Sequence, residues 1–152
     1  MAAYISSELA GVFGTANQTA AATGYKPAAT VYQARTKRLR ATFTLGSTAV
    51  TTSDTLAVGT LPAGSTFAYG IINASATMGA SATLAIGNAS STGKYRAAAV
   101  FTAAAPTLFG DVAAEGASTP LAADEPVIIT IAAASLPTSG TLVVDIFYSA
   151  PN

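Results

Sequence analysis

Apolar and polar residues alternate with a period of two from Arg38 onward. Leu39, Ala41, Phe43 and Leu45 alternate with arginine and threonine residues, which is the pattern of a half-buried strand. The same period, or a short apolar run, recurs in six further segments: 55–58, 65–77, 81–86, 94–102, 126–133 and 141–149. We predict each of these segments as a strand, and the irregular segment 103–123 as a place for one more short strand.

Glycine and proline separate these segments and indicate turns between them. Residues 61–64 read Leu-Pro-Ala-Gly, which fits a type I turn with proline at the second position and glycine at the fourth. Seven or eight short strands without a long helix predict an all-β protein, an antiparallel β-sandwich or barrel. The pattern leaves jelly-roll and immunoglobulin-like topologies both open.

The segment before Arg38 lacks a sustained period and is rich in small and polar residues. A segment of this length without its own secondary structure is usually ordered only against a partner or not at all. We therefore predict an extended N-terminal arm over residues 1–37 and a β-sandwich domain over residues 38–152. Aromatic residues concentrate binding energy at interfaces, so four spaced aromatic residues are candidate anchors for another surface: Tyr4, Phe13, Tyr25 and Tyr32.

Composition and charge point to burial against other subunits. The chain is 51% hydrophobic, much of it alanine, and only 9% charged. Alanine buries little area, so we expect a thin core that gains from contacts with neighbouring copies. The net charge is zero, yet residues 1–40 carry five basic residues and one acidic residue, whereas residues 41–152 carry two basic and six acidic residues. Such a chain favours docking of its basic part on an acidic neighbour.

The densest charge lies in residues 35–40. Its basic residues are Arg35, Lys37, Arg38 and Arg40. Salt bridges between subunits are the favoured interpretation, and a solvated strand face comes second. Nucleic-acid binding is the least favoured of the three, since no aromatic residue is interleaved for base stacking.

The residue types exclude most catalytic chemistry. The chain has neither cysteine nor histidine, so it lacks thiolates, the commonest general base and the commonest transition-metal ligand. Asp124 and Glu125 are adjacent, and neighbours on an extended chain point apart, so we interpret them as the entry to a strand. We predict no enzymatic activity, no cofactor and no metal.

The sequence also shows no targeting signal. The N-terminus lacks a signal-peptide layout, and no apolar run is long enough to span a membrane. Three Asn-x-Ser/Thr triplets begin at Asn17, Asn73 and Asn88. Such triplets arise easily by chance in a chain this rich in serine and threonine. We expect a protein made inside the cell.

Four segments in order resemble the decoration, or cement, proteins of tailed-bacteriophage heads. These are Leu56–Ile72, Thr83–Gly87, Thr119–Asp124 and Gly140–Tyr148. The resemblance implies a jelly-roll sandwich on the outer surface of the virion. It also implies a partner, the major capsid protein, whose neighbouring subunits the chain would bridge, and self-association as a dimer or trimer.

A carbohydrate- or receptor-binding β-sandwich of a phage fibre or other surface structure is the alternative. Sugar platforms usually need exposed aromatic side chains, and this chain is 8% aromatic without tryptophan. The composition therefore favours the structural role.

Overall fold

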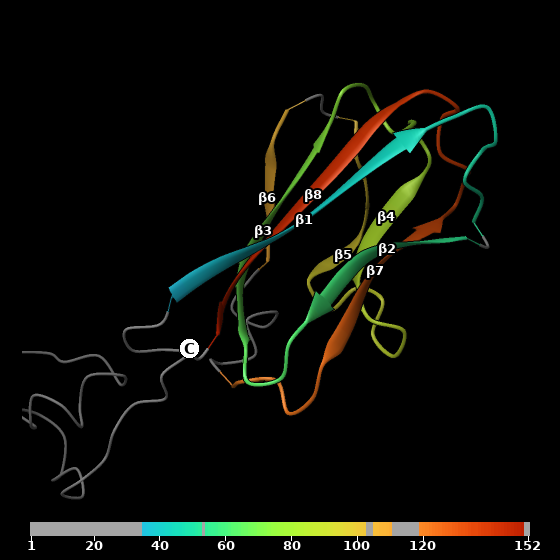
Figure 1. Ribbon diagram of the computed structural model, residues 1–152. Helices are drawn as coiled ribbons and strands as arrows, with labels where there is room; N and C mark the ends of the chain where they lie inside the picture. Colours follow the sequence, from blue (N-terminus) through green and yellow to red (C-terminus); the bar gives the residue numbers. More distant parts are fainter. Residues whose placement is uncertain (1–34, 53, 103–104, 111–118, 151–152) are drawn as a thin grey trace, which may run out of the picture.

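Two antiparallel four-stranded sheets pack face to face in a computed structural model of the chain (Figure 1). The structure describes residues 35–52, 54–102, 105–110 and 119–150. Within these ranges every regular element is a strand, and no helix is present that could cross a membrane. The prediction of an all-β sandwich is confirmed.

The sheets have different strand orders. Sheet A contains β1 (Arg35–Leu45), β8 (Gly140–Ala150), β3 (Thr66–Ala74) and β6 (Thr107–Phe109), in that order. Sheet B contains β2 (Thr55–Leu61), β7 (Glu125–Ala132), β4 (Thr83–Gly87) and β5 (Arg96–Val100).

The pairing of the strands defines a jelly roll. β1 pairs with β8, β2 with β7, β3 with β6 and β4 with β5, so the first half of the chain pairs with the second half in reverse order. Such a long folded hairpin, wrapped into two sheets, is the eight-stranded jelly-roll arrangement. Of the two topologies that the pattern left open, the structure has the jelly roll.

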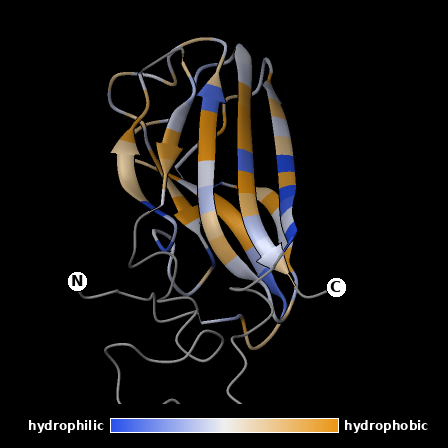
Figure 2. Ribbon diagram, turned by 90° about the vertical axis from the view of Figure 1, so that its left-hand side faces the viewer, coloured by the Kyte–Doolittle hydropathy of each residue, from blue (hydrophilic) through white to orange (hydrophobic). Residues whose placement is uncertain are grey.

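The core lies between the sheets and consists mainly of branched aliphatic side chains. On β8 the inward-facing Leu142, Val144 and Ile146 have no exposed surface, as the alternation predicts. Figure 2 shows hydrophobic and hydrophilic segments alternating along the strands. Much of the alanine lies elsewhere, since Ala97–Ala99 are exposed on β5. The core therefore contains a smaller share of alanine than the composition of the chain suggested.

Two local predictions are corrected by the structure. The turn after β2 is hydrogen-bonded from the Ser65 amide to the Pro62 carbonyl, one residue later than predicted. This hydrogen bond makes Gly64 the third residue of the turn, and its φ is 76°. A positive φ at the third position is typical of a type II turn. Separately, β1 begins at Arg35, opposite Ala150, and not at Arg38. The domain division at residues 37 and 38 stays a prediction, because residues 1–34 lie outside the described part.

Candidate functional site

The outer face of sheet A exposes apolar side chains. Residues directly opposite one another in an antiparallel sheet point to the same side, so Arg40, Asp145, Ile71 and Leu108 form one row across the four strands. Leu108 is 71% exposed because β6 is a short edge strand. We use "the outer face" for the outward residues of this sheet: Arg38, Arg40, Tyr69, Ile71, Leu108, Val143, Asp145 and Phe147.

An aromatic pair lies at the centre of the outer face. Tyr69 is paired with Phe147 in the sheet register, and their rings stack with centroids 4.7 Å apart. The register of β3 shifts between Phe67 and Tyr69, so Phe67 is buried and Tyr69 is 41% exposed. Exposed apolar groups gathered in this way mark surfaces that contact other molecules.

A salt bridge borders the aromatic pair on the side of β1. The Arg40 guanidinium donates two hydrogen bonds of 2.7 Å to the two carboxylate oxygens of Asp145, and Arg38 lies 3.8 Å from the same carboxylate. The hydrogen bonds from Arg40 hold the pKa of Asp145 below its usual range. They also raise the pKa of Arg40. In Figure 2 the hydrophilic bands gather along one edge strand of the sheet facing the viewer.

The four predicted basic residues lie on one strand but do not act alike. Arg38 and Arg40 point outward, as the alternation predicts, and their acid partner belongs to the same chain. Arg35 and Lys37 lie on the alternate positions, exposed at the beginning of β1, and form no ion pair among the described residues. The sequence analysis missed Asp145, although it is the only charged residue in a strand of otherwise apolar and neutral residues.

We expect the Arg40–Asp145 pair to stabilise the fold only above moderately acidic pH. Because the folded pKa of Asp145 lies below the unfolded value of about 3.9, the stability it contributes is complete above that value. It is lost as the pH falls through the folded pKa. The urea midpoint of Arg40→Met should therefore lie below that of the wild type above about pH 5, and the gap should shrink below about pH 4. The matched control is Lys37→Met, and a gap that stays constant with pH would contradict the assignment.

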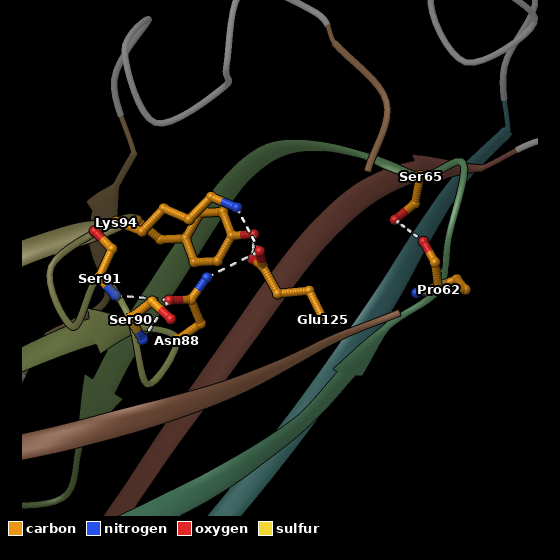
Figure 3. Close-up of polar contacts among 8 residues, drawn as sticks. Pro62, Ser65, Asn88, Ser90, Ser91, Lys94 and Glu125 are labelled. Atoms are coloured by element: carbon orange, nitrogen blue, oxygen red, sulfur yellow. Dashed lines mark hydrogen bonds and ion pairs between the residues drawn. The ribbon is translucent and has the colours of Figure 1, made fainter. Parts of the chain in front are cut away.

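A second polar cluster surrounds Glu125 at the beginning of β7 (Figure 3). Its carboxylate oxygen Oε2 accepts hydrogen bonds from Lys94 Nζ at 2.6 Å and from Asn88 Nδ2 at 2.9 Å. The Tyr95 hydroxyl donates to the other oxygen, Oε1. These partners lie in or next to the loop between β4 and β5, so the cluster fastens that loop to sheet B. We call the group formed by Asn88, Lys94, Tyr95 and Glu125 the hairpin cluster.

Burial and hydrogen bonding set the ionisation of the hairpin cluster. Burial alone would raise the pKa of Glu125, but the hydrogen bonds from Lys94, Tyr95 and Asn88 outweigh it and lower this pKa. Burial raises the pKa of Tyr95, and the bond to Glu125 adds to that shift. The cluster therefore holds an ionised carboxylate and a neutral phenol within hydrogen-bond contact.

The adjacent residues Asp124 and Glu125 have different hydrogen-bond partners, as expected for neighbours at the entry to a strand. Asp124 accepts a hydrogen bond of 2.8 Å from the Ala63 amide and so holds the turn after β2, whereas Glu125 serves the hairpin cluster. Among the described residues no group of three or more acidic, histidine or cysteine side chains lies together as a metal site. An open groove of about 450 Å³ lies beside the cluster, lined by Asn88, Asp124, Glu125 and apolar side chains of Leu121, Pro126 and Ile128.

The predicted aromatic anchors lie outside the described residues. Tyr4, Phe13, Tyr25 and Tyr32 all belong to residues 1–34, so their role stays a prediction. The outer face supplies Tyr69, Phe147 and Leu108, which the sequence analysis had not chosen. Tyr69 and Phe147 sit on strands that were predicted. The alternation of β8 indicates that Phe147 points outward, whereas Tyr69 points outward because the register of β3 shifts between Phe67 and Tyr69.

No family model matches the chain, and no curated protein matches it. Among solved structures, the fold is similar to a chain of the capsid of Ralstonia phage GP4, with a TM-score of 0.58 and 18% identity, over 78% of this chain and 86% of that one. It is also similar to a chain of the cyanophage Pam1 capsid asymmetric unit, with a TM-score of 0.53 and 20% identity, over 92% of this chain and 99% of that one. The chain thus has the fold of chains of about its own size in two phage capsid structures.

Proposed function

We propose that this chain is a structural protein of a phage virion, a decoration protein on the outside of the head. In this role it bridges neighbouring major capsid subunits and stabilises the shell. The observation that carries the proposal is the jelly-roll fold, shared over most of both chains with components of two phage capsids. The ordered motif segments of the sequence support the decoration role in particular.

The outer face supports contact with another protein. Three large hydrophobic side chains are exposed among the described residues, and two of them, Tyr69 and Leu108, lie on this face. Protein interfaces combine an apolar, aromatic centre with arginine and a polar rim. The outer face has this composition, with Arg38 and Arg40 beside Tyr69 and Phe147.

The N-terminal segment supplies a second contact in this proposal. Its aromatic residues Tyr4, Phe13, Tyr25 and Tyr32 are the proposed anchors, and Arg35 and Lys37 at the start of β1 pair with acidic groups on the capsid or on an adjacent copy. Each contact is weak alone, but repetition of the same contacts by linked copies raises the overall affinity. The proposal requires self-association as a dimer or trimer.

Binding to heads tests the proposal. The full chain is mixed with heads of the phage that encodes it, prepared without this chain, and the pelleted fraction is measured. We expect Leu108→Ser to weaken binding at least about tenfold, as for an interface hot spot. Val100→Ser is the matched control, since Val100 is 45% exposed on the other sheet.

Separate outcomes address the separate parts of the proposal. Failure of the wild-type chain to bind heads would contradict the decoration role. Equal binding by Leu108→Ser would remove the outer face from the contact. Full-strength binding by a chain lacking residues 2–34 would show that the arm is dispensable.

Carbohydrate binding remains the alternative because one observation favours it. The stacked rings of Tyr69 and Phe147 lie on an exposed sheet face, and exposed aromatic faces are what a sugar platform requires. A glycan array of host surface sugars separates the two functions. Binding to a sugar that Tyr69→Ala abolishes would favour the alternative over the structural role.

A further inference from the structure

The hairpin cluster places an amine and a carboxamide on the same oxygen atom. Lys94 Nζ and Asn88 Nδ2 are both hydrogen-bonded to Glu125 Oε2, at 2.6 Å and 2.9 Å. Figure 3 shows the two side chains approaching the carboxylate together. A nucleophile and its target are thereby held close to one carboxylate that can transfer protons between them.

The carboxamide of Asn88 is held in one orientation. Its oxygen Oδ1 accepts hydrogen bonds from the backbone amides of Ser90, at 3.0 Å, and Ser91, at 2.7 Å. Donors on one side and a carboxylate acceptor on the other assign oxygen and nitrogen without ambiguity. Two backbone N–H groups aimed at a carbonyl oxygen also stabilise the negative charge that develops there when a nucleophile adds to the carbonyl carbon.

Glu125 is positioned for proton transfer. The Tyr95 hydroxyl occupies Oε1, which leaves Oε2 for the two nitrogen atoms. The Glu125 side chain is 15% exposed and that of Lys94 is 30% exposed, so solvent competes weakly for their protons. A carboxylate in contact with both the attacking and the leaving nitrogen serves first as general base and then as general acid.

We propose that Lys94 and Asn88 form an isopeptide bond within the folded chain, with Glu125 as the acid–base group. Oε2 takes a proton from the Lys94 ammonium, and the freed Nζ lone pair attacks Cγ of Asn88. The resulting oxyanion at Oδ1 is bound by the Ser90 and Ser91 amides. Glu125 then gives its proton to Nδ2 and takes one from Nζ.

Collapse of this intermediate completes the reaction. The bond between Cγ and Nδ2 breaks and ammonia leaves, while the new bond between Cγ and Nζ becomes an amide. Ammonia takes up the proton that remains on Glu125 and departs as ammonium, which restores the carboxylate. The open groove that Asn88 and Glu125 line provides its path to solvent. No oxidant, cofactor or second substrate is needed.

The cross-link would close the loop between β4 and β5. Asn88 directly follows β4, and one residue, Tyr95, separates Lys94 from the start of β5. A covalent bond between them prevents the hairpin from slipping in register. The reaction occurs once per chain, so it is a modification of the protein and not turnover of a substrate.

Mass spectrometry of the full chain tests the proposal. After folding and prolonged incubation at neutral pH, we expect the intact mass to lie below the mass of the unmodified chain by one ammonia. Tandem spectra should show a branched peptide that joins residues 88 and 94. An unmodified mass for the wild-type chain would overturn the proposal, and would mean that the cluster is only a hydrogen-bonded clamp.

Two variants and one control separate the cross-link from other losses of ammonia. Lys94→Arg keeps the positive charge but removes the nucleophilic amine, and Glu125→Gln removes the acid–base group. Each variant should therefore show the mass calculated from its own sequence, without loss of ammonia. Asn73→Ala is the matched control, because Asn73 and Asn88 both begin an Asn-Ala-Ser triplet. It should lose ammonia like the wild type. Loss that persists in Lys94→Arg would indicate cyclisation of Asn88 on its own backbone and would overturn the proposal.

Discussion

Replacement of Ile146 by alanine is expected to lower the free energy of unfolding by about 2–5 kcal/mol. Ile146 has no exposed surface, and its strand β8 is paired on both sides, with β1 and β3. Neighbouring strands cannot move inward to fill the space without breaking their hydrogen bonds to β8. The loss therefore includes the hydrophobic transfer energy and the cost of the cavity left behind.

Urea unfolding of the full chain measures this effect, with the slope of the transition compared between variants. Val143→Ala is the matched control on the same strand, since Val143 points to the outer face and is half-buried. We expect its effect to stay below about 1 kcal/mol, as for a substitution away from the core. Equal losses in the two variants would contradict the assigned inward and outward phases of β8.

Replacement of Gly87 by alanine is expected to cost about 1–3 kcal/mol, the range for overpacking a close contact. A Cβ atom at Gly87 would lie 2.1 Å from the carbonyl oxygen of Ser91 and 2.7 Å from the Thr92 backbone. The obstacle is backbone, so no side chain can turn away to make room. The Ser91 carbonyl also accepts hydrogen bonds from the amides of Asn88 and Lys94, and its displacement would separate the two partners of the proposed cross-link.

Gly87→Ala should therefore lower stability and abolish the loss of ammonia together. Gly93→Ala is the control in the same loop, because a Cβ there meets its nearest atom at 3.4 Å, an ordinary contact. We expect Gly93→Ala to change stability by less than about 0.5 kcal/mol and to keep the cross-link. Stability close to wild type in Gly87→Ala, measured by urea unfolding, would contradict the close approach of the loop.

The strands that were easiest to predict are those with the longest alternation. β8 was placed within one residue at each end, and its inward set is buried as expected. β6 has three residues, Thr107–Phe109, too few for a period to appear. The sequence therefore predicted one short strand within residues 103–123 without its bounds. β1 extends to Arg35 because its partner β8 continues to Ala150 and supplies hydrogen bonds, although the side chains there carry no alternation.

The two polar clusters show a different limit. Arg40 was identified from its charge and its outward phase, but Asp145 lies 105 positions further along the chain. Likewise Asn88 and Glu125 are 37 positions apart. In the sequence Asn88 is notable only as the first residue of an Asn-x-Ser triplet. Neither residue type nor spacing indicates such pairs, because they meet through the register of strands distant in sequence.

By itself the sequence determined the all-β class, most of the strands and, where the alternation is regular as on β8, which side of the strand is buried. These follow from the backbone pleat, which turns successive side chains to opposite faces and acts over a few neighbouring residues. The tertiary structure alone decided the jelly-roll pairing, the intramolecular partner of Arg40 and the meeting of Lys94 with Asn88 on Glu125. These depend on the packing of two sheets around one core, where the register of one strand is set by residues far away in the chain.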